Sequence, residues 1–158
     1  MMKKSINCAE AVDRMQKGVA WGMLICGLTY LVLLIEELTP SGKLNQILDG
    51  ISGLGVVMTL GVTFLAMWPL MKMKLQGKFK LVKEPESFFS NAMLMSFKNG
   101  WIASMVTIIL LLGFSSWLET FELSHKFFFI LLFAVSVLSV SISFFWQTRK
   151  DDLEQLEE

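Results

Sequence analysis

Ionisable and metal-binding side chains are scarce in this sequence. Its 158 residues include one histidine and two cysteines, and 18% are charged, against about 25% in a typical soluble domain. So few ligands do not suffice for a metal centre, a haem pocket or a hydrolytic triad. The 14 basic and 14 acidic residues balance, which removes the basic excess typical of nucleic-acid binders. We therefore expect neither an enzyme nor a cofactor, and no nucleic-acid partner.

Charge is missing altogether from four long stretches. No Asp, Glu, Lys, Arg or His occurs in residues 19–35, 51–71, 100–118 and 127–146. As helices these stretches would span roughly 25 to 31 Å, which matches the hydrocarbon core of a bilayer. A soluble bundle would need a polar face on each helix, and these stretches are apolar on nearly all sides. The sequence predicts an all-α membrane protein with four transmembrane helices in an up-down bundle.

The basic residues predict the orientation of the four helices. Twelve of the fourteen Lys and Arg residues fall in the N-terminal segment, the middle loop and the C-terminal tail, whereas Lys43 and Lys126 fall on the other side. Because Lys and Arg concentrate in cytoplasmic loops, both termini are predicted to be cytoplasmic, in a plasma membrane and most simply a bacterial inner membrane. Four of the five tryptophans lie near the cytoplasmic ends of their stretches, as interfacial aromatic residues do: Trp21, Trp68, Trp101 and Trp146.

The transmembrane part as a whole covers residues 19–146. The segments outside its four spans differ in character. Residues 1–18 have loosely spaced apolar positions and predict an interfacial helix that leads into the first span. The outer loop before residue 51 carries Leu44, Ile47 and Leu48, which we expect on the membrane surface. The tail, residues 147–158, is acidic and is expected to extend the fourth helix. His125, at the outer boundary, is expected to have a surface role.

The cytoplasmic loop, residues 72–99, is the longest polar segment. In its first half, lysines alternate with apolar residues around Gln76-Gly77. This spacing fits a β-hairpin, or equally a second helix that continues past Pro69 to Gly77. The lysines are candidates for binding a partner or anionic lipid, although they would also serve simply to fix the topology: Lys72, Lys74, Lys78, Lys80 and Lys83.

Small and hydroxyl residues recur inside the spans at intervals of three or four, so each set lies on one helix face. Such faces let helix backbones approach closely and form hydrogen bonds between helices. They predict helix packing, or else a hydroxyl-lined path in an oligomer. The candidates for either role are Gly22, Cys26, Gly55, Thr59, Thr63, Ser104, Thr107, Ser136, Ser139 and Ser143.

The spans contain no ionisable group, so the usual marks of proton relays, ion-coupled carriers and voltage sensors are missing. We expect a small multi-pass protein that acts through helix–helix and basic-loop contacts with a membrane partner. Its partners would be membrane lipids and either another membrane protein or further copies of itself. Accessory subunits of transport or secretion systems and immunity or exclusion factors work in this way. The alternative is a homo-oligomeric channel or permease for a small neutral solute.

Overall fold

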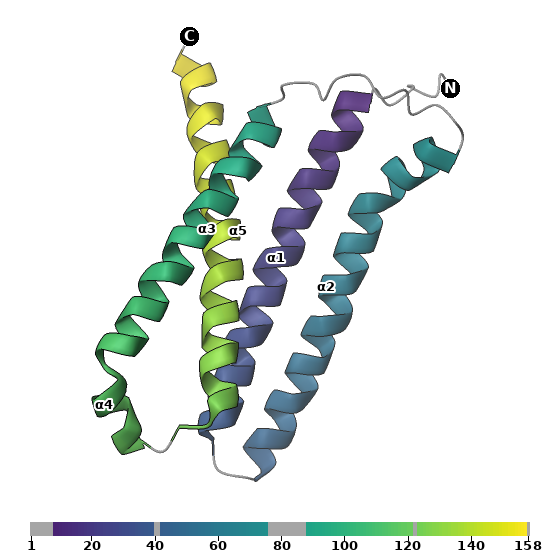
Figure 1. Cartoon of the computed structure of the whole chain (residues 1–158). Coiled ribbons are helices and arrows are strands. Elements are labelled where there is room, and N and C mark those ends of the chain that lie inside the picture. The colour runs from purple at the N-terminus through teal and green to yellow at the C-terminus, as the bar shows by residue number, and fades with distance from the viewer. Residues whose placement is uncertain (1–7, 40–41, 76–87, 122, 158) are drawn as a thin grey trace.

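The computed structural model describes residues 8–39, 42–75, 88–121 and 123–157, and their regular structure is helical. Four long helices are α1 (Cys8–Leu38), α2 (Lys43–Leu75), α3 (Phe88–Gly113) and α5 (His125–Glu157). Two short elements, α4 (Ser115–Leu118) and the 3₁₀ helix η1 (Glu119–Phe121), join α3 to α5 (Figure 1). Each long helix is long and apolar enough to cross a membrane. The prediction of a helical, multi-pass membrane protein is thus confirmed at this level.

The four long helices have unequal numbers of neighbours. α1 packs against α2 on one side and α5 on the other, and α5 also packs against α3. α1 meets α3 over a short stretch, and among the described residues α2 packs against neither α3 nor α5. Figure 1 shows α2 at one edge of the molecule, beside α1. The helices therefore form an open arrangement, which differs from a bundle in which all four packing faces meet.

The core lies where α1, α3 and α5 converge. Ala20, Ala92, Met93 and Phe144 pack together there, and Phe144 is fully buried. The alanines let the three backbones come close enough to enclose that ring. Toward the other end of the molecule, a second apolar cluster joins α1 and α5 without α3, formed by Leu34, Ile130 and Ala134 with their neighbours.

Two boundaries near the first helices differ from the sequence-based expectation. α2 begins at Lys43, so Leu44, Ile47 and Leu48 lie in its first two turns and not in a surface loop. α1 runs without a break from Cys8, so residues 8–18 form no separate surface helix, whereas residues 1–7 lie outside the described residues. The absence of charge marked the apolar part of each helix but could not show how far the helix continues into polar sequence.

α2 continues through Pro69 to Leu75. Lys72 and Lys74 are therefore helical, and no hairpin begins at residue 72. Proline removes one backbone hydrogen bond and kinks a helix, and α2 bends in its last turns in Figure 1. Lys78, Lys80 and Lys83 lie outside the described residues, as does the rest of the expected hairpin.

The third helix is shifted relative to its charge-free stretch. α3 begins at Phe88 and ends at Gly113, five residues before the expected end at 118. Phe114 has φ −103° and ψ 13°, which takes the backbone out of the helix before α4 begins. Glycine is a poor helix former, so Gly113 is a suitable place for this break. α5 instead extends beyond its apolar part to Glu157, as expected for the tail.

Candidate functional site: the helix seams

The contact between α1 and α2, here called the α1–α2 seam, brings together small residues from the faces that the sequence singled out on these two helices. A Cβ added at Gly22 would lie 2.6 Å from the Thr63 hydroxyl oxygen, and one added at Gly55 would collide with Thr29. Gly18 meets Ala66 in the same way. The partners run in opposite order along the two helices, so α1 and α2 are antiparallel. Since a Cβ would not fit, the seam needs glycine at these positions.

Hydroxyl groups in the α1–α2 seam donate to their own helices. Thr29 Oγ1 donates to the Ile25 carbonyl at 2.8 Å, and Thr59 Oγ1 donates to the Gly55 carbonyl at 2.9 Å. Cys26 is half-buried on α1. Because the Thr29 and Thr59 hydroxyls already have acceptors, they can be buried in the seam without water or a further partner.

The contact between α3 and α5, here called the α3–α5 seam, also places a glycine against the opposite helix and has hydroxyl groups that bond within their own helix. A Cβ added at Gly100 would meet Val140 and lie 3.2 Å from the Ser136 carbonyl oxygen. Ser104 Oγ donates to the Gly100 carbonyl at 2.9 Å, and Thr107 Oγ1 donates to the Ala103 carbonyl at 2.8 Å. Gly100 of α3 therefore lies directly against the α5 backbone. The hydroxyls of Ser104 and Thr107 have their hydrogen-bond acceptors within α3.

Ser143 forms the centre of a polar cluster between α3 and α5. Its hydroxyl oxygen accepts hydrogen bonds from Asn99 Nδ2 at 2.7 Å and from Gln147 Nε2 at 3.0 Å. Gln147 Nε2 also lies 3.4 Å from the hydroxyl of the buried Ser96. The sequence pointed to Ser143 but not to its partners, because Ser96, Asn99 and Gln147 lie outside the charge-free stretches. The signal that could have found them is the helical spacing of Ser96 and Asn99 and of Ser143 and Gln147.

The α1–α5 seam contains a hydrogen bond that the sequence did not indicate. Ser141 is fully buried, and its hydroxyl donates to the Ala20 carbonyl on α1 at 2.9 Å. Gly27 lies against Leu138, whose Cγ would be 2.5 Å from an added Cβ. Ser139, the candidate two residues before Ser141, is half-buried on α5. The serine that joins two helices thus lies outside the predicted face of Ser136, Ser139 and Ser143.

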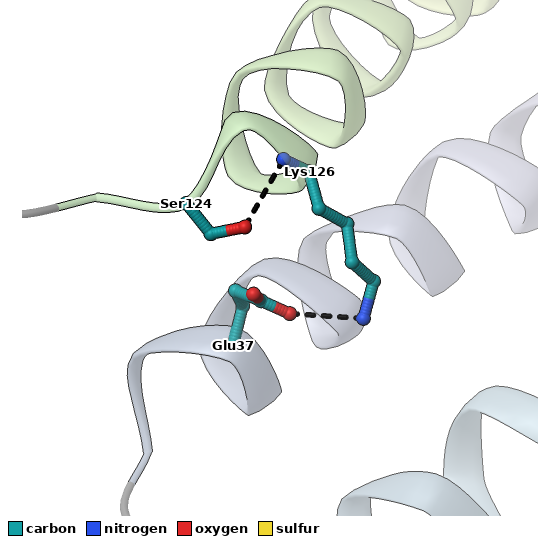
Figure 2. A network of polar contacts seen from close by, with 3 residues as sticks. All are labelled: Glu37, Ser124 and Lys126. Carbon is teal, nitrogen blue, oxygen red and sulfur yellow. Dashed lines mark hydrogen bonds and ion pairs between the residues drawn. The ribbon is translucent and has the colours of Figure 1, made fainter.

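An ion pair joins the end of α1 to the start of α5. Lys126 Nζ lies 2.9 Å from Glu37 Oε2, while the Lys126 backbone N–H donates to the Ser124 hydroxyl at 3.2 Å (Figure 2). The lysine side chain is 67% exposed and the glutamate 23%. Exposed pairs add little stability, so the apolar cluster of Leu34, Ile130 and Ala134, rather than this ion pair, holds these helix ends together.

Two of the five candidate lysines lie within the described residues. Lys72 and Lys74 are exposed in the last turn of α2, whereas Lys78, Lys80 and Lys83 lie outside the described residues. Within the described ranges, no group of three or more His, Cys, Asp or Glu side chains is placed to hold a metal ion.

Comparison with protein-family models, curated proteins and solved structures finds no match for this chain. The candidate site therefore rests on the geometry above. The residues singled out from the sequence lie mainly in contacts between helices, and these contacts hold α1 against α2 and α5 against α3.

Proposed function

We propose that this protein acts by binding another membrane component through its helices and its basic cytoplasmic segment. It would serve as an accessory subunit of a larger membrane system or as an immunity or exclusion factor. We place it in a bacterial inner membrane with both termini and the lysine-rich segment in the cytoplasm, since twelve of its fourteen Lys and Arg residues then lie inside.

The exposure of α2 is the observation that carries this proposal. Only 6% of its apolar window is buried inside the molecule, against 28% for α1. Six residues lie on the side of α2 opposite the α1–α2 seam, and we call them the open face of α2: Gly50, Gly53, Val57, Gly61, Phe64 and Trp68.

The open face of α2 has the composition of a helix-packing surface. Nothing lies within 4 Å of where a Cβ would stand at Gly50, Gly53 or Gly61. Glycines let a second backbone approach closely, and close packing drives helix association in lipid. Phe64 and Trp68 are exposed beside them, with ring centroids 5.5 Å apart. A partner helix would meet three glycines and two aromatic rings on the same face of α2.

Lysines at the cytoplasmic end of α2 would add a second contact. Lys72 and Lys74 are exposed in its last turn, and three more lysines follow in the sequence, at positions 78, 80 and 83. Each lysine near an anionic surface contributes about 1 kcal/mol. The same helix therefore offers an apolar contact within the membrane and a charged contact at its surface.

The arrangement gives less support to a channel. Thr59 and Thr63 lie in the α1–α2 seam, and the Thr59 hydroxyl already donates to the Gly55 carbonyl. Hydroxyls that are packed between two helices of the same molecule are poorly placed to line a path for a neutral solute.

Native mass spectrometry of the tagged protein, extracted gently from its own membrane, tests the proposal. We expect a stoichiometric membrane companion in the wild type that is lost in Gly53→Leu and Gly61→Leu, because the new side chains fill the open face. Ser116→Leu on α4 is the control, since Ser116 is also exposed and lies outside the open face of α2, and it should keep the companion.

A second comparison separates partner binding from conduction. Neutralising Lys78, Lys80 and Lys83 should weaken the complex and leave liposome permeability unchanged. A closed homo-oligomer with no companion, whose solute flux changes in Thr59→Val or Ser139→Ala, would contradict the proposal and favour the channel. Retention of the companion in both α2 variants would also contradict the role given to the open face.

A further inference from the structure

A cavity of about 500 Å³ lies between the end of α3 and the start of α5. The two helices are in contact at Gly100 and Asn99. Farther along, α3 breaks at Gly113, and α4 and η1 carry the chain across to α5. Figure 1 shows α4 set away from α5 at this end of the molecule. The cavity is an open one, lined by residues of α3, of the α4–η1 segment and of α5.

The lining of this cavity is mostly apolar, and its polar residues all lie beyond the end of α3. Ile108, Leu111 and Leu112 line it on α3 and Phe128 on α5, while Leu118 and Leu123 line it beside the polar Ser115, Glu119 and His125. In a helix that crosses a membrane, position along the chain corresponds to depth. The apolar part of the cavity therefore lies within the hydrocarbon layer and the polar part at its edge.

An aromatic pair supports this placement. Trp117 and Phe121 pack with ring centroids 4.8 Å apart, and both side chains are more than half exposed. Tryptophan is enriched at the level of lipid headgroups, so this pair places α4 and η1 at the membrane surface. Glu119 lies between these two residues in the sequence and is thus at headgroup level.

We propose that this cavity binds one zwitterionic phospholipid from the surrounding leaflet, with an acyl chain among the leucines and the headgroup beside Glu119 and His125. The volume is within the usual range for ligand sites, about 300 to 1,000 Å³. An apolar cavity does not hold water well, and acyl chains are the apolar molecules at this depth.

Charge favours a zwitterionic headgroup over an anionic one. The Glu119 carboxylate would repel an anionic headgroup and attract the ammonium of a zwitterionic one, while an N–H of His125 can donate to the phosphate. Lys126, the neighbouring cation, is paired with Glu37 on α1 and does not offset the carboxylate. The site does not depend on the identity of the protein partner proposed above.

Photolabelling in bilayers tests the proposal. The full-length protein is reconstituted with a trace of phosphatidylcholine that carries a diazirine on its acyl chain, and the labelled residues are mapped by mass spectrometry. In the wild type, labelling should concentrate at residues 108–119, several-fold above the exposed positions of α2. Uniform labelling of all lipid-facing positions would overturn the proposal without any variant.

Two variants locate the acyl chain. Leu111→Trp fills the cavity and should lower labelling there several-fold. Ile109→Trp is the matched control, since Ile109 is 66% exposed and does not line the cavity, and its labelling should equal that of the wild type. Circular dichroism and gel filtration check that both variants fold. Equal labelling in folded Leu111→Trp and wild type would overturn the assignment.

A headgroup comparison completes the test. The same diazirine chain on phosphatidylglycerol, which is anionic, should label the wild-type cavity several-fold less than phosphatidylcholine does. Glu119→Gln should remove that difference. Equal labelling of the wild type by both lipids would overturn the headgroup assignment.

Discussion

α1 and α2 differ in how far the protein covers them, although both are long apolar helices. Of the apolar window of α1, 28% is buried inside the molecule, against 6% for α2. α1 packs between α2 and α5, whereas α2 packs against α1 alone among the described residues. Lipid tails are as apolar as leucine, so an apolar helix face is equally suited to lipid and to protein. Hydropathy therefore shows which helices can cross the membrane, but not which helices pack between others inside the molecule.

The glycines sharpen the same contrast. Gly22 and Gly55 lie where an added Cβ would meet the opposite helix, while Gly53 and Gly61 have open space around them. The residue type is the same on both sides of α2, and one side is closed by α1. Four substitutions test this contrast between covered and open positions, and they are ordered by the size of the change that we expect.

Gly22→Leu should have the largest effect. The new side chain would collide with Thr63 and force α1 and α2 apart, which should lower the free energy of unfolding by about 3 kcal/mol. Gly61→Leu adds the same side chain on the open face and should leave stability unchanged. Unfolding in detergent by added SDS, followed by tryptophan fluorescence, measures both. Equal losses would remove the distinction between the two sides of α2.

Phe144→Ala should follow. Phe144 is fully buried between α1, α3 and α5, whereas Phe129 on the same helix is 75% exposed. Because lipid also solvates a phenyl ring, the loss is mainly that of packing, about 2 kcal/mol, which is less than the about 3 to 5 kcal/mol of a soluble core. The same SDS titration should show Phe129→Ala at wild-type stability, and a comparable loss there would contradict the placement of the core.

Ser141→Ala should lower stability by about 0.6 kcal/mol, the average for hydrogen bonds between helices in a membrane protein. Its hydroxyl donates across the seam to Ala20, whereas that of Ser104, which is also buried, donates within α3. Ser104→Ala should therefore be neutral. Repeated SDS titrations can resolve this difference, and a larger loss for Ser104→Ala would mean that the wrong serine has been assigned to helix joining.

Lys126→Ala should give the smallest change. Its ion pair with Glu37 is exposed on the lysine side, so water and salt screen it. We expect a small loss of stability at low ionic strength that disappears at high salt, measured by thermal unfolding in a nonionic detergent. Lys43→Ala, a change at an exposed lysine at the start of α2, should show no such salt dependence.

The sequence identified the residues that lie in the α1–α2 seam better than those in the contacts of α5. Gly22, Gly55 and Thr63 lie on faces that periodicity alone identifies, and the structure brings these faces together. Ser141 was missed because periodicity gives the direction of a face along one helix but not the helix that it meets. Its partner Ala20 is 121 residues away in the sequence.

The cavity could not be found from the sequence for a related reason. The charge-free stretch 100–118 reads as one continuous helix, and its interruption at Gly113 and Phe114 leaves charge and hydropathy unchanged. Glycines also occur inside the intact helices, for example Gly61 in α2, so the residue type alone did not mark the break. His125 was expected to have only a surface role, and the structure adds that it lines this cavity.

Four long apolar helices that are able to cross a membrane could be predicted from the sequence alone. The physical reason is local, because backbone groups in lipid must bond within their own helix and charges there are costly. Three features could be seen only in the tertiary structure. α1 packs between α2 and α5, one face of α2 is uncovered, and a cavity lies between the end of α3 and the start of α5. These features depend on shape at each contact, since lipid and protein offer an apolar surface nearly the same environment and only close packing distinguishes them.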